Sequence, residues 1–177
     1  GFIDLLPRVA EFFHARQTDI EQQNSALLKL FTQSLPAGGD EYIRSRQPIE
    51  AAWIRLHHLH DATFGGFGDA PKFLHPAELA FCLRRFVMDG NQDALQLVTH
   101  TLEKMAAGGL YDQLGGGFCR YSTDRYWHIP HFEKMLYDNA QLVRVYLHLY
   151  QAGRHSDDVA GREQAGSFRN IAIGTLE

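Results

Sequence analysis

Residues 131–151 read HFEKMLYDNAQLVRVYLHLYQ, and this stretch carries the strongest helical pattern in the chain. Its apolar side chains recur every three or four positions, which places them on one side of an α-helix. The stretch follows directly after Pro130. We therefore predict a helix from about His131 to Gln151.

The same spacing predicts further helices on both sides of this one. They cover residues 5–13, 20–31, 49–63, 76–88, 91–107 and 168–176. A Pro-Ala-Gly-Gly break at residues 36–39 ends the second helix, and the polar residues 152–166 predict a loop. Because no stretch alternates convincingly between apolar and polar residues, we expect an all-α fold of successive antiparallel helices.

Composition narrows the classes of protein further. The 177 residues are 45% hydrophobic and 21% charged, which suffices for one core and predicts a single domain over residues 1–177. The formal net charge of −4, without a basic stripe, argues against nucleic acid or an anionic membrane as the main partner. No apolar run approaches the roughly 20 residues that cross a bilayer. Cys82 and Cys119 have no metal-site spacing and fit a reducing, cytoplasmic compartment.

Two loops are not ordinary connections between helices. Residues 64–73 read FGGFGDAPKF, and residues 108–130 contain three consecutive glycines together with several aromatic residues. A connection as long as the second loop is uncommon in a compact domain and is usually functional or disordered. Its aromatic content argues against disorder, so we expect these loops to carry function.

Polar residues at the start of the strongest helix allow two interpretations. At 100° per residue, His131 and Asp138 lie about 20° apart on the helix surface, so the carboxylate could orient the imidazole for acid–base chemistry. The alternative is capping of the helix and ordinary surface charge. Asn139 falls within the apolar arc, where it either ties down a neighbouring loop or faces a ligand pocket.

The longer glycine loop also allows two interpretations. Asp112, Arg120, Tyr121, Asp124 and Trp127 could line a pocket of the size of a sugar, with aromatic stacking and paired carboxylates. Alternatively, the loop packs on itself and Arg120 pairs with Asp112 or Asp124.

Metal and cofactor sites are not expected. His128 and His131 with Glu133 have a loose spacing, and the chain contains no HExxH motif. The histidines at positions 57, 58 and 60 point to different sides of their helix, so we interpret them as core or surface residues. The glycine loops lack the patterns that bind phosphate.

Three long motifs resemble those of one known family. Residues 65–73, residues 108–124 and residues 127–141 are similar to motifs of the thioredoxin-domain-containing family that includes the spermatogenesis-associated thioredoxin-like proteins. The resemblance extends from the first helix to about Gln151, although Cys119 stands where that family commonly has a histidine. Family members place a thioredoxin-like domain before a toroid of helical hairpins, similar to N-acylglucosamine 2-epimerases and six-hairpin glycosidases.

The resemblance implies a partial (α/α) toroid that belongs to a longer chain. The lack of an initial methionine fits the same expectation. The implied partners are the thioredoxin-like domain of that longer chain and a sugar-like small molecule. Apolar helix surfaces left open in a partial toroid would also allow a homodimer.

The implied activity is carbohydrate processing, for which two sets of catalytic residues are open. Epimerisation would use His131 or His128 as the base that removes a proton beside a carbonyl, with Asp138 orienting it. Hydrolysis would use Asp112 and Asp124 as the two carboxyl groups.

The residues expected to bind the substrate are Tyr111, Arg120, Tyr121, Trp127 and Asn139. Trp127 and Tyr111 would stack on the sugar, and Arg120 would hold it by hydrogen bonds. The competing hypothesis is a binding or scaffolding module without catalytic activity.

Overall fold

A computed structural model describes residues 1–34, 45–155 and 157–177 of the chain. The chain divides into two compact units, residues 1–45 and residues 46–177. The break expected at residues 36–39 lies outside the described residues. The expectation of a single domain over the whole chain stays a prediction.

The first unit contains two helices, α1 (Phe2–Ala15) and α2 (Gln17–Ser34). The N-terminal amine donates a hydrogen bond to the Asp4 carboxylate over 2.6 Å, in the first turn of α1. Such an acidic side chain also interacts favourably with the positive end of the helix dipole. Both helices confirm the elements predicted around residues 5–13 and 20–31.

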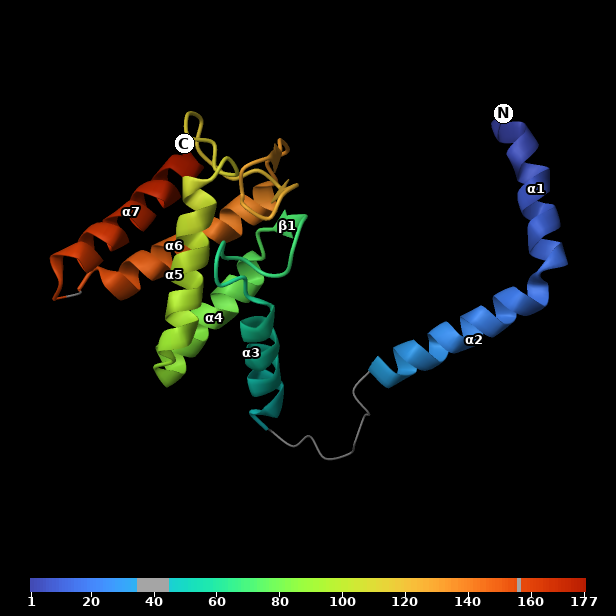
Figure 1. Ribbon diagram of the computed structural model, residues 1–177, viewed down its shortest axis with the longest axis horizontal. Coiled ribbons are helices and arrows are strands. Elements are labelled where there is room, and N and C mark those ends of the chain that lie inside the picture. The colour runs from blue at the N-terminus through green and yellow to red at the C-terminus, as the bar shows by residue number, and fades with distance from the viewer. Residues whose placement is uncertain (35–44, 156) are drawn as a thin grey trace. The chain divides into compact units, whose positions relative to one another are not determined.

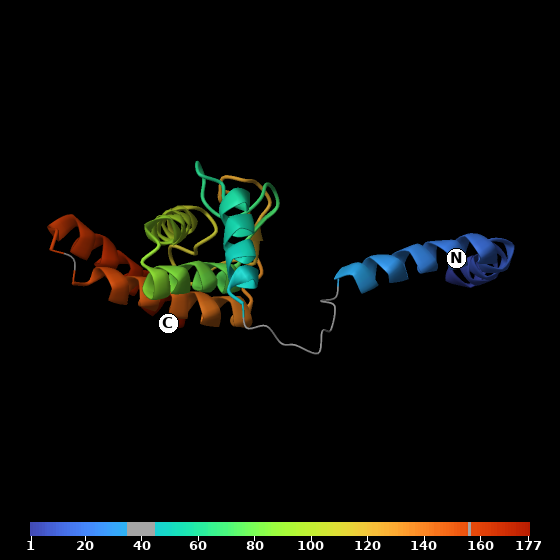
Figure 2. The same ribbon diagram turned by 90° about the horizontal axis from the view of Figure 1, so that it is seen from below.

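The second unit contains five helices among its described residues. They are α3 (Gln47–Leu59), α4 (Pro76–Asp89), α5 (Gln92–Ala107), α6 (Leu136–Gly153) and α7 (Val159–Leu176). Helix α4 packs against both α5 and α6, and α7 runs along α6 (Figure 1; Figure 2). The Asn91 side chain caps α5 by accepting from the Ala94 amide at 2.9 Å. The all-α prediction is confirmed.

The core of the second unit lies where α4, α5 and α6 meet the glycine loops. Leu79, Val98, Leu102 and Leu142 are completely buried there, and the Tyr146 hydroxyl donates to the Leu102 carbonyl at 2.8 Å. The amphipathic spacing in the sequence therefore does mark the buried faces. Among the described residues, no helix combines the length and apolarity needed to cross a bilayer.

The start of α6 differs from the sequence prediction. Pro130 and His131 form strand β3 (Pro130–His131), which pairs antiparallel with β2 (Tyr121–Ser122), and β2 pairs with β1 (Lys72–Phe73). The Glu133 carbonyl accepts from the Arg120 amide at 2.7 Å. These backbone bonds hold residues 130–133 extended, so the helix begins at Leu136 and the predicted start at His131 is wrong.

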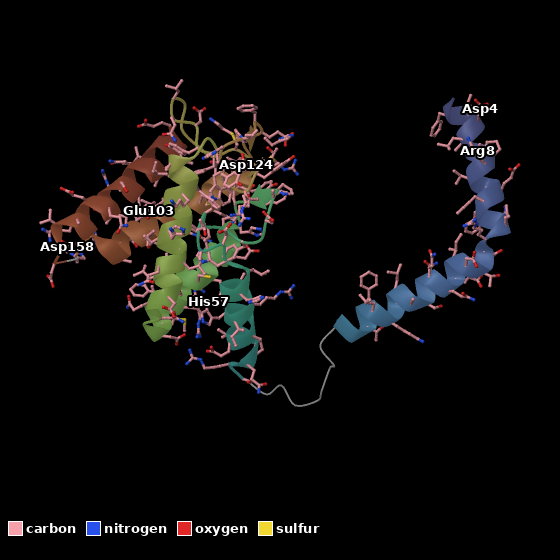
Figure 3. All side chains as sticks on the ribbon, in the orientation of Figure 1. Asp4, Arg8, His57, Glu103, Asp124 and Asp158 are labelled. Atoms are coloured by element: carbon pink, nitrogen blue, oxygen red, sulfur yellow. The ribbon has the colours of Figure 1, made fainter. Side chains whose placement is uncertain are left out.

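The loop predicted for residues 152–166 is also too long. Helix α7 begins at Val159 because Asp158, labelled in Figure 3, caps it by accepting from the amides of Ala160 and Gly161. Ala165 and Phe168 are then buried beside α6. The sequence pattern did not predict this amphipathic face because residues 152–166 are mostly polar and include glycines.

Candidate functional site

The two glycine loops enclose Trp127, which is completely buried. Its indole Nε1 donates to the Phe64 carbonyl at 2.7 Å. A Cβ atom on Gly66 would lie 2.5 Å from Trp127 Cζ2, and one on Gly108 would lie 2.5 Å from the Trp127 carbonyl oxygen. Both positions therefore require glycine because the tryptophan approaches the backbone closely.

A buried ion pair lies beside this tryptophan. The Lys72 ammonium is completely buried, and it donates to Asp61 Oδ2 and to the Gly65 carbonyl, each at 2.7 Å. It also lies 5.4 Å from the centre of the Trp127 ring. Arg125 donates to the same Asp61 oxygen at 3.0 Å. A buried ammonium needs such partners, since an unpaired one is strongly destabilising.

The pKa of Asp61 reflects these contacts. Burial of the carboxyl favours its neutral form, but hydrogen bonds from Lys72, from the Phe64 amide and from Arg125 outweigh burial and lower the pKa. The pair therefore stays ionised and holds the first glycine loop in place.

Asp124 and Asp112 hold the second glycine loop. Asp124, labelled in Figure 3, accepts from the amides of Tyr126, His128 and Ile129. Asp112 accepts from the Gly115 amide at 2.9 Å and from the Lys134 ammonium at 2.7 Å. The Asp112 pKa is lowered by the Gly115 amide and Lys134, and the backbone amides lower the Asp124 pKa against the effect of burial. Both carboxylates are therefore engaged in loop structure.

Asn139 ties the second glycine loop to α6. Its side-chain oxygen accepts from the Phe118 amide at 2.7 Å, and its nitrogen donates to the Phe118 carbonyl at 3.0 Å. The same nitrogen donates to the Met135 carbonyl at 3.0 Å, at the start of the helix. Of the two interpretations of this residue, the structure supports the one in which it holds a loop.

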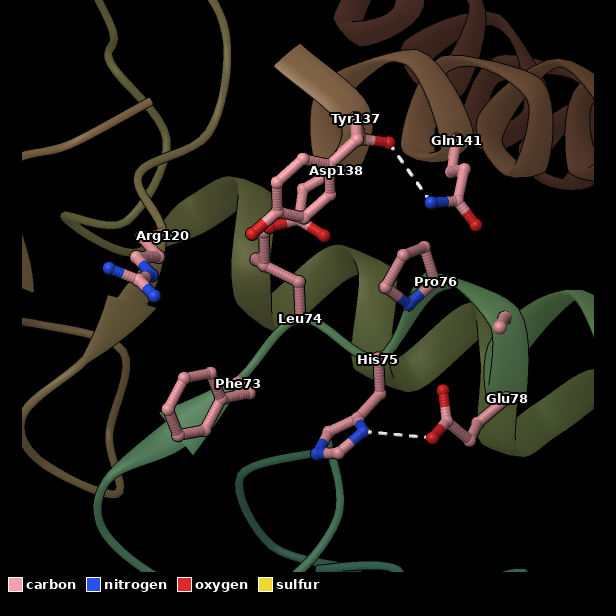
Figure 4. Close-up of a pocket in the computed structure, with 10 residues that line it drawn as sticks. Phe73, Leu74, His75, Pro76, Glu78, Arg120, Tyr137, Asp138 and Gln141 are labelled. Atoms are coloured by element: carbon pink, nitrogen blue, oxygen red, sulfur yellow. Dashed lines mark hydrogen bonds and ion pairs between the residues drawn. The ribbon is translucent and has the colours of Figure 1, made fainter. Parts of the chain in front are cut away.

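An open hollow of about 370 Å³ lies between the amino-terminal ends of α4 and α6 (Figure 4). Its polar and aromatic lining comes from three parts of the chain. The lining includes Phe73, His75, Glu78, Arg120, Tyr137 and Asp138. A hollow of this volume is within the range of small-molecule sites.

The ionisable groups of the hollow include the features needed for proton transfer. Burial raises the pKa of Asp138, although the nearby charges of Arg120 and His75 oppose that shift. His75 Nδ1 lies 3.1 Å from Glu78 Oε1, which fixes the orientation of the imidazole (Figure 4). His75 also has a φ of +48°, a left-handed conformation that a non-glycine residue adopts only at an energetic cost.

The structure brings two of the ten predicted site residues, Arg120 and Asp138, to this hollow. His131 lies in β3 with its ring stacked on Tyr121 at 4.9 Å, so it does not share a helix face with Asp138 as predicted. Tyr111 and Trp127 are buried and present no open face for stacking.

Two further predicted site residues, Arg120 and His128, contact other residues of the same region of the chain. Arg120 donates to Glu133 at 2.9 Å, and not to Asp112 or Asp124. The His128 amide donates to Asp124, while its side chain is exposed beside Tyr126. The catalytic and binding roles assigned to these residues stay predictions.

Sequence reasoning missed His75 and Glu78 as site residues. The available signal was a histidine before Pro76, three positions ahead of a glutamate that it can contact across the first helical turn. It also missed the Lys72–Asp61 ion pair, because residues eleven positions apart in a loop have no periodic relation.

The other histidines of the described residues have neighbours of a different kind. His60 contacts Thr101 at 3.4 Å, and burial together with His100 lowers the pKa of its imidazole. His57 lies beside Trp53 on α3. In the parts of the chain that the structure describes, no three His, Cys, Asp or Glu side chains are grouped to hold a metal ion.

Two solved structures have a fold similar to that of this chain. The chain is similar to the crystal structure of a sugar epimerase from a ruminal bacterium, with a TM-score of 0.57 and 18% identity over 74% of this chain and 36% of that one. A cellobiose 2-epimerase from Spirochaeta thermophila gives a TM-score of 0.50 with 20% identity, over 72% and 36% of the two chains. At this identity the likeness establishes the fold, an incomplete (α/α) toroid.

Comparisons of the sequence find particular relatives. The chain is 40% identical to spermatogenesis-associated protein 20 of Mus musculus, over all of this chain and 22% of that protein. It is 39% identical to the Homo sapiens protein of the same name, over 85% of this chain and 20% of that protein. The chain thus spans about a fifth of the length of these curated relatives. No family model matches the chain.

Proposed function

We propose that the second unit supplies part of a carbohydrate-processing toroid, in which the hollow beside Asp138 holds a polyhydroxylated ligand. The observation that carries this proposal is an Asp138 carboxyl with a raised pKa beside the oriented His75–Glu78 pair, in one open hollow. The likeness to sugar epimerases supports the proposal through the fold alone.

The side chains of the hollow match the chemistry of a sugar. Phe73 and Tyr137 are 43% and 55% exposed, so both rings present surface to the C–H face of a sugar, while Phe73 also packs against Tyr121 at 4.9 Å. Arg120 can donate hydrogen bonds to hydroxyl or carbonyl oxygens. Asp138 accepts a proton more readily than an exposed aspartate because burial disfavours its charge.

Of the two reactions considered from the sequence, proton transfer beside a carbonyl is favoured. His75 would act as the base, oriented by Glu78, and Asp138 would donate a hydrogen bond or proton to the substrate oxygen. Hydrolysis by Asp112 and Asp124 is less favoured. Both have lowered pKa values, whereas a general acid for glycoside cleavage needs a raised one.

A scaffolding role is the second candidate. It is supported by the internal hydrogen bonds of Asp112, Asp124 and Asn139, which use these side chains to fix loops. In that case the helical unit would present partners or substrates to a thioredoxin-like domain of the same longer chain. Formation of a homodimer through exposed apolar helix surfaces would be compatible with either role.

The test measures exchange of deuterium into the C2 position of a panel of aldoses, by nuclear magnetic resonance. It is run on this chain and on the longer protein of which we propose it is a part. We expect exchange by the complete protein, and a loss of at least about tenfold on substitution at the positions of His75 or Asp138 (H75Q, D138N). The exposed Glu163→Gln on α7 is the matched control.

The outcomes separate the two roles. Exchange that disappears in H75Q and D138N but persists in E163Q supports the enzymatic role. If the complete protein neither exchanges nor binds any aldose in a titration, the carbohydrate proposal is rejected and the scaffolding role is favoured.

A further inference from the structure

A second hollow, of about 450 Å³, follows a groove between α4 and α6. Ala80, Leu83, Arg84 and Val87 form the α4 side of this groove. Their spacing of three and four positions places them on one stripe of that helix. Val87 is 71% exposed although it is apolar, so the stripe continues the core outward to an uncovered surface.

The α6 side of the groove is also one stripe. Arg144, His148, Gln151 and Ala152 repeat every three or four positions along the helix, and all four are exposed. Helices α4 and α6 lie side by side and are in contact (Figure 2). Because residues of both stripes line the same hollow, the two stripes form its walls. Its residues are distinct from those of the hollow beside Asp138.

The charged groups along this groove are all basic. Arg84, Arg144 and His148 line it, and no carboxylate does. The neighbouring Arg85 shows the contrast, since it is buried and paired with both Glu50 and Asp89. Within the described ranges, neither Arg84 nor Arg144 forms an ion pair. The groove therefore combines an apolar floor with two arginines whose charges are not compensated.

We propose that this groove docks an acidic amphipathic helix of a partner. Two parallel stripes of side chains suit a third helix, whose apolar residues at positions i, i+3, i+4 and i+7 would contact Leu83 and Val87. Acidic residues beside that apolar stripe would pair with Arg84 and Arg144, whose aliphatic stems extend the apolar surface. Complementary charge thus identifies the occupant, and the proposal does not rest on the carbohydrate activity.

The experiment measures binding of two synthetic helical peptides to the full chain by fluorescence anisotropy. Both peptides carry the same leucines at helical spacing, and one has glutamates where the other has lysines. We expect the glutamate peptide alone to bind. Its affinity should fall at least about tenfold when salt is raised from about 50 mM to about 500 mM, because salt screens exposed charges.

Charge reversal locates the site. The double variant R84E/R144E should weaken binding of the glutamate peptide at least about tenfold. The control R55E/R169E changes the net charge equally at exposed positions on α3 and α7, and it should bind as the unmodified chain does. Val87→Asp, at an exposed position, gives a second variant that removes the apolar contact with little effect on folding.

Three results would overturn the proposal. They are equal binding of both peptides, binding that R84E/R144E and V87D leave unchanged, and an absence of binding to the glutamate peptide. Preferential binding to anionic lipid vesicles, or self-association that R84E/R144E abolishes, would assign the groove to a membrane or to a second copy and would likewise reject it.

Discussion

Packing around Trp127 explains the glycines of the two loops, which the sequence alone suggested to be part of a binding site. The indole occupies the space where Gly66 would carry a side chain, and the Trp127 backbone itself has a φ of +67°. Strained backbone of this kind persists only where its surroundings hold it in place. We conclude that the glycine motifs preserve a packing arrangement around the tryptophan, on which the nearby strands depend.

A pair of glycine substitutions tests this role. Gly66→Ala combines an unfavourable φ of +76° with a Cβ only 2.5 Å from Trp127 Cζ2, so we expect a loss of about 3 kcal/mol or more in the free energy of unfolding. Gly68→Ala has nearly the same φ of +73° but open space around its Cβ, and it should lose only about 1 kcal/mol. Urea unfolding followed by tryptophan fluorescence measures both. Equal losses would show that backbone strain, and not the tryptophan, requires glycine.

The Asp61–Lys72 pair predicts a dependence of stability on pH. The folded pKa of Asp61 is lowered, so its stabilising effect is complete above about pH 4, the pKa of an unfolded aspartate, and is lost as the pH falls toward the folded value. Asp61→Asn leaves the buried Lys72 without its counter-charge, and should cost about 3 kcal/mol at pH 7.

The difference between the original chain and D61N should therefore shrink when urea unfolding is repeated at about pH 3. Asp157→Asn, at an exposed position, serves as the control and should change stability little at either pH. A D61N difference that stays constant with pH would show that the lost ionisation is not the cause.

At the scale of the element, the sequence predicted the helices better than the connections. Periodicity depends on contacts between near neighbours in the chain, and it located α3, α4 and α5 within a few residues. The start of α6 depends on backbone bonds between Arg120 and Glu133, and on the pairing of two-residue strands. Such pairing depends on tertiary contacts, so the prediction from the local pattern began the helix too early, at His131.

The hollow beside Asp138 is likewise formed by residues that are far apart in the sequence. Asp138 was predicted as a site residue, but from a helical alignment with His131 that does not exist. Its actual neighbours, His75 and Glu78, belong to the start of another helix, which lies more than fifty positions earlier in the chain. One sequence without related sequences contains no signal for that distant approach.

Asn139 connects helix α6 with the second glycine loop, so replacing it should loosen the loop at Phe118 while the interior of the helices stays protected. Asn139→Ala removes bonds to both backbone groups of Phe118, so we expect a loss of about 1–3 kcal/mol and faster hydrogen exchange of the Phe118 amide. Amides inside α5 exchange through global unfolding, so their exchange should speed up only as far as the loss of global stability requires. The exposed Asn170→Ala on α7 is the control, and unchanged exchange at Phe118 in N139A would contradict the role of a tether.

At the scale of the whole molecule, the buried side chains lie in one part of the sequence. Among the described residues, every buried apolar side chain falls between Phe67 and Ala172, inside the second unit. One contiguous core is what makes a domain able to fold by itself. This distribution bears on how the chain folds, because the first unit contributes no buried side chain among its described residues.

We therefore expect residues 46–177 to fold without residues 1–45. The shortened chain should unfold cooperatively in urea, with the same midpoint that tryptophan fluorescence reports for the complete chain, because both tryptophans, Trp53 and Trp127, lie in the second unit. Gly66→Ala should lower that midpoint equally in both chains, since the clash with Trp127 lies within the second unit. A shortened chain that lacks a cooperative transition would show that its core needs the first unit, and residues 1–177 would then be one domain in the thermodynamic sense.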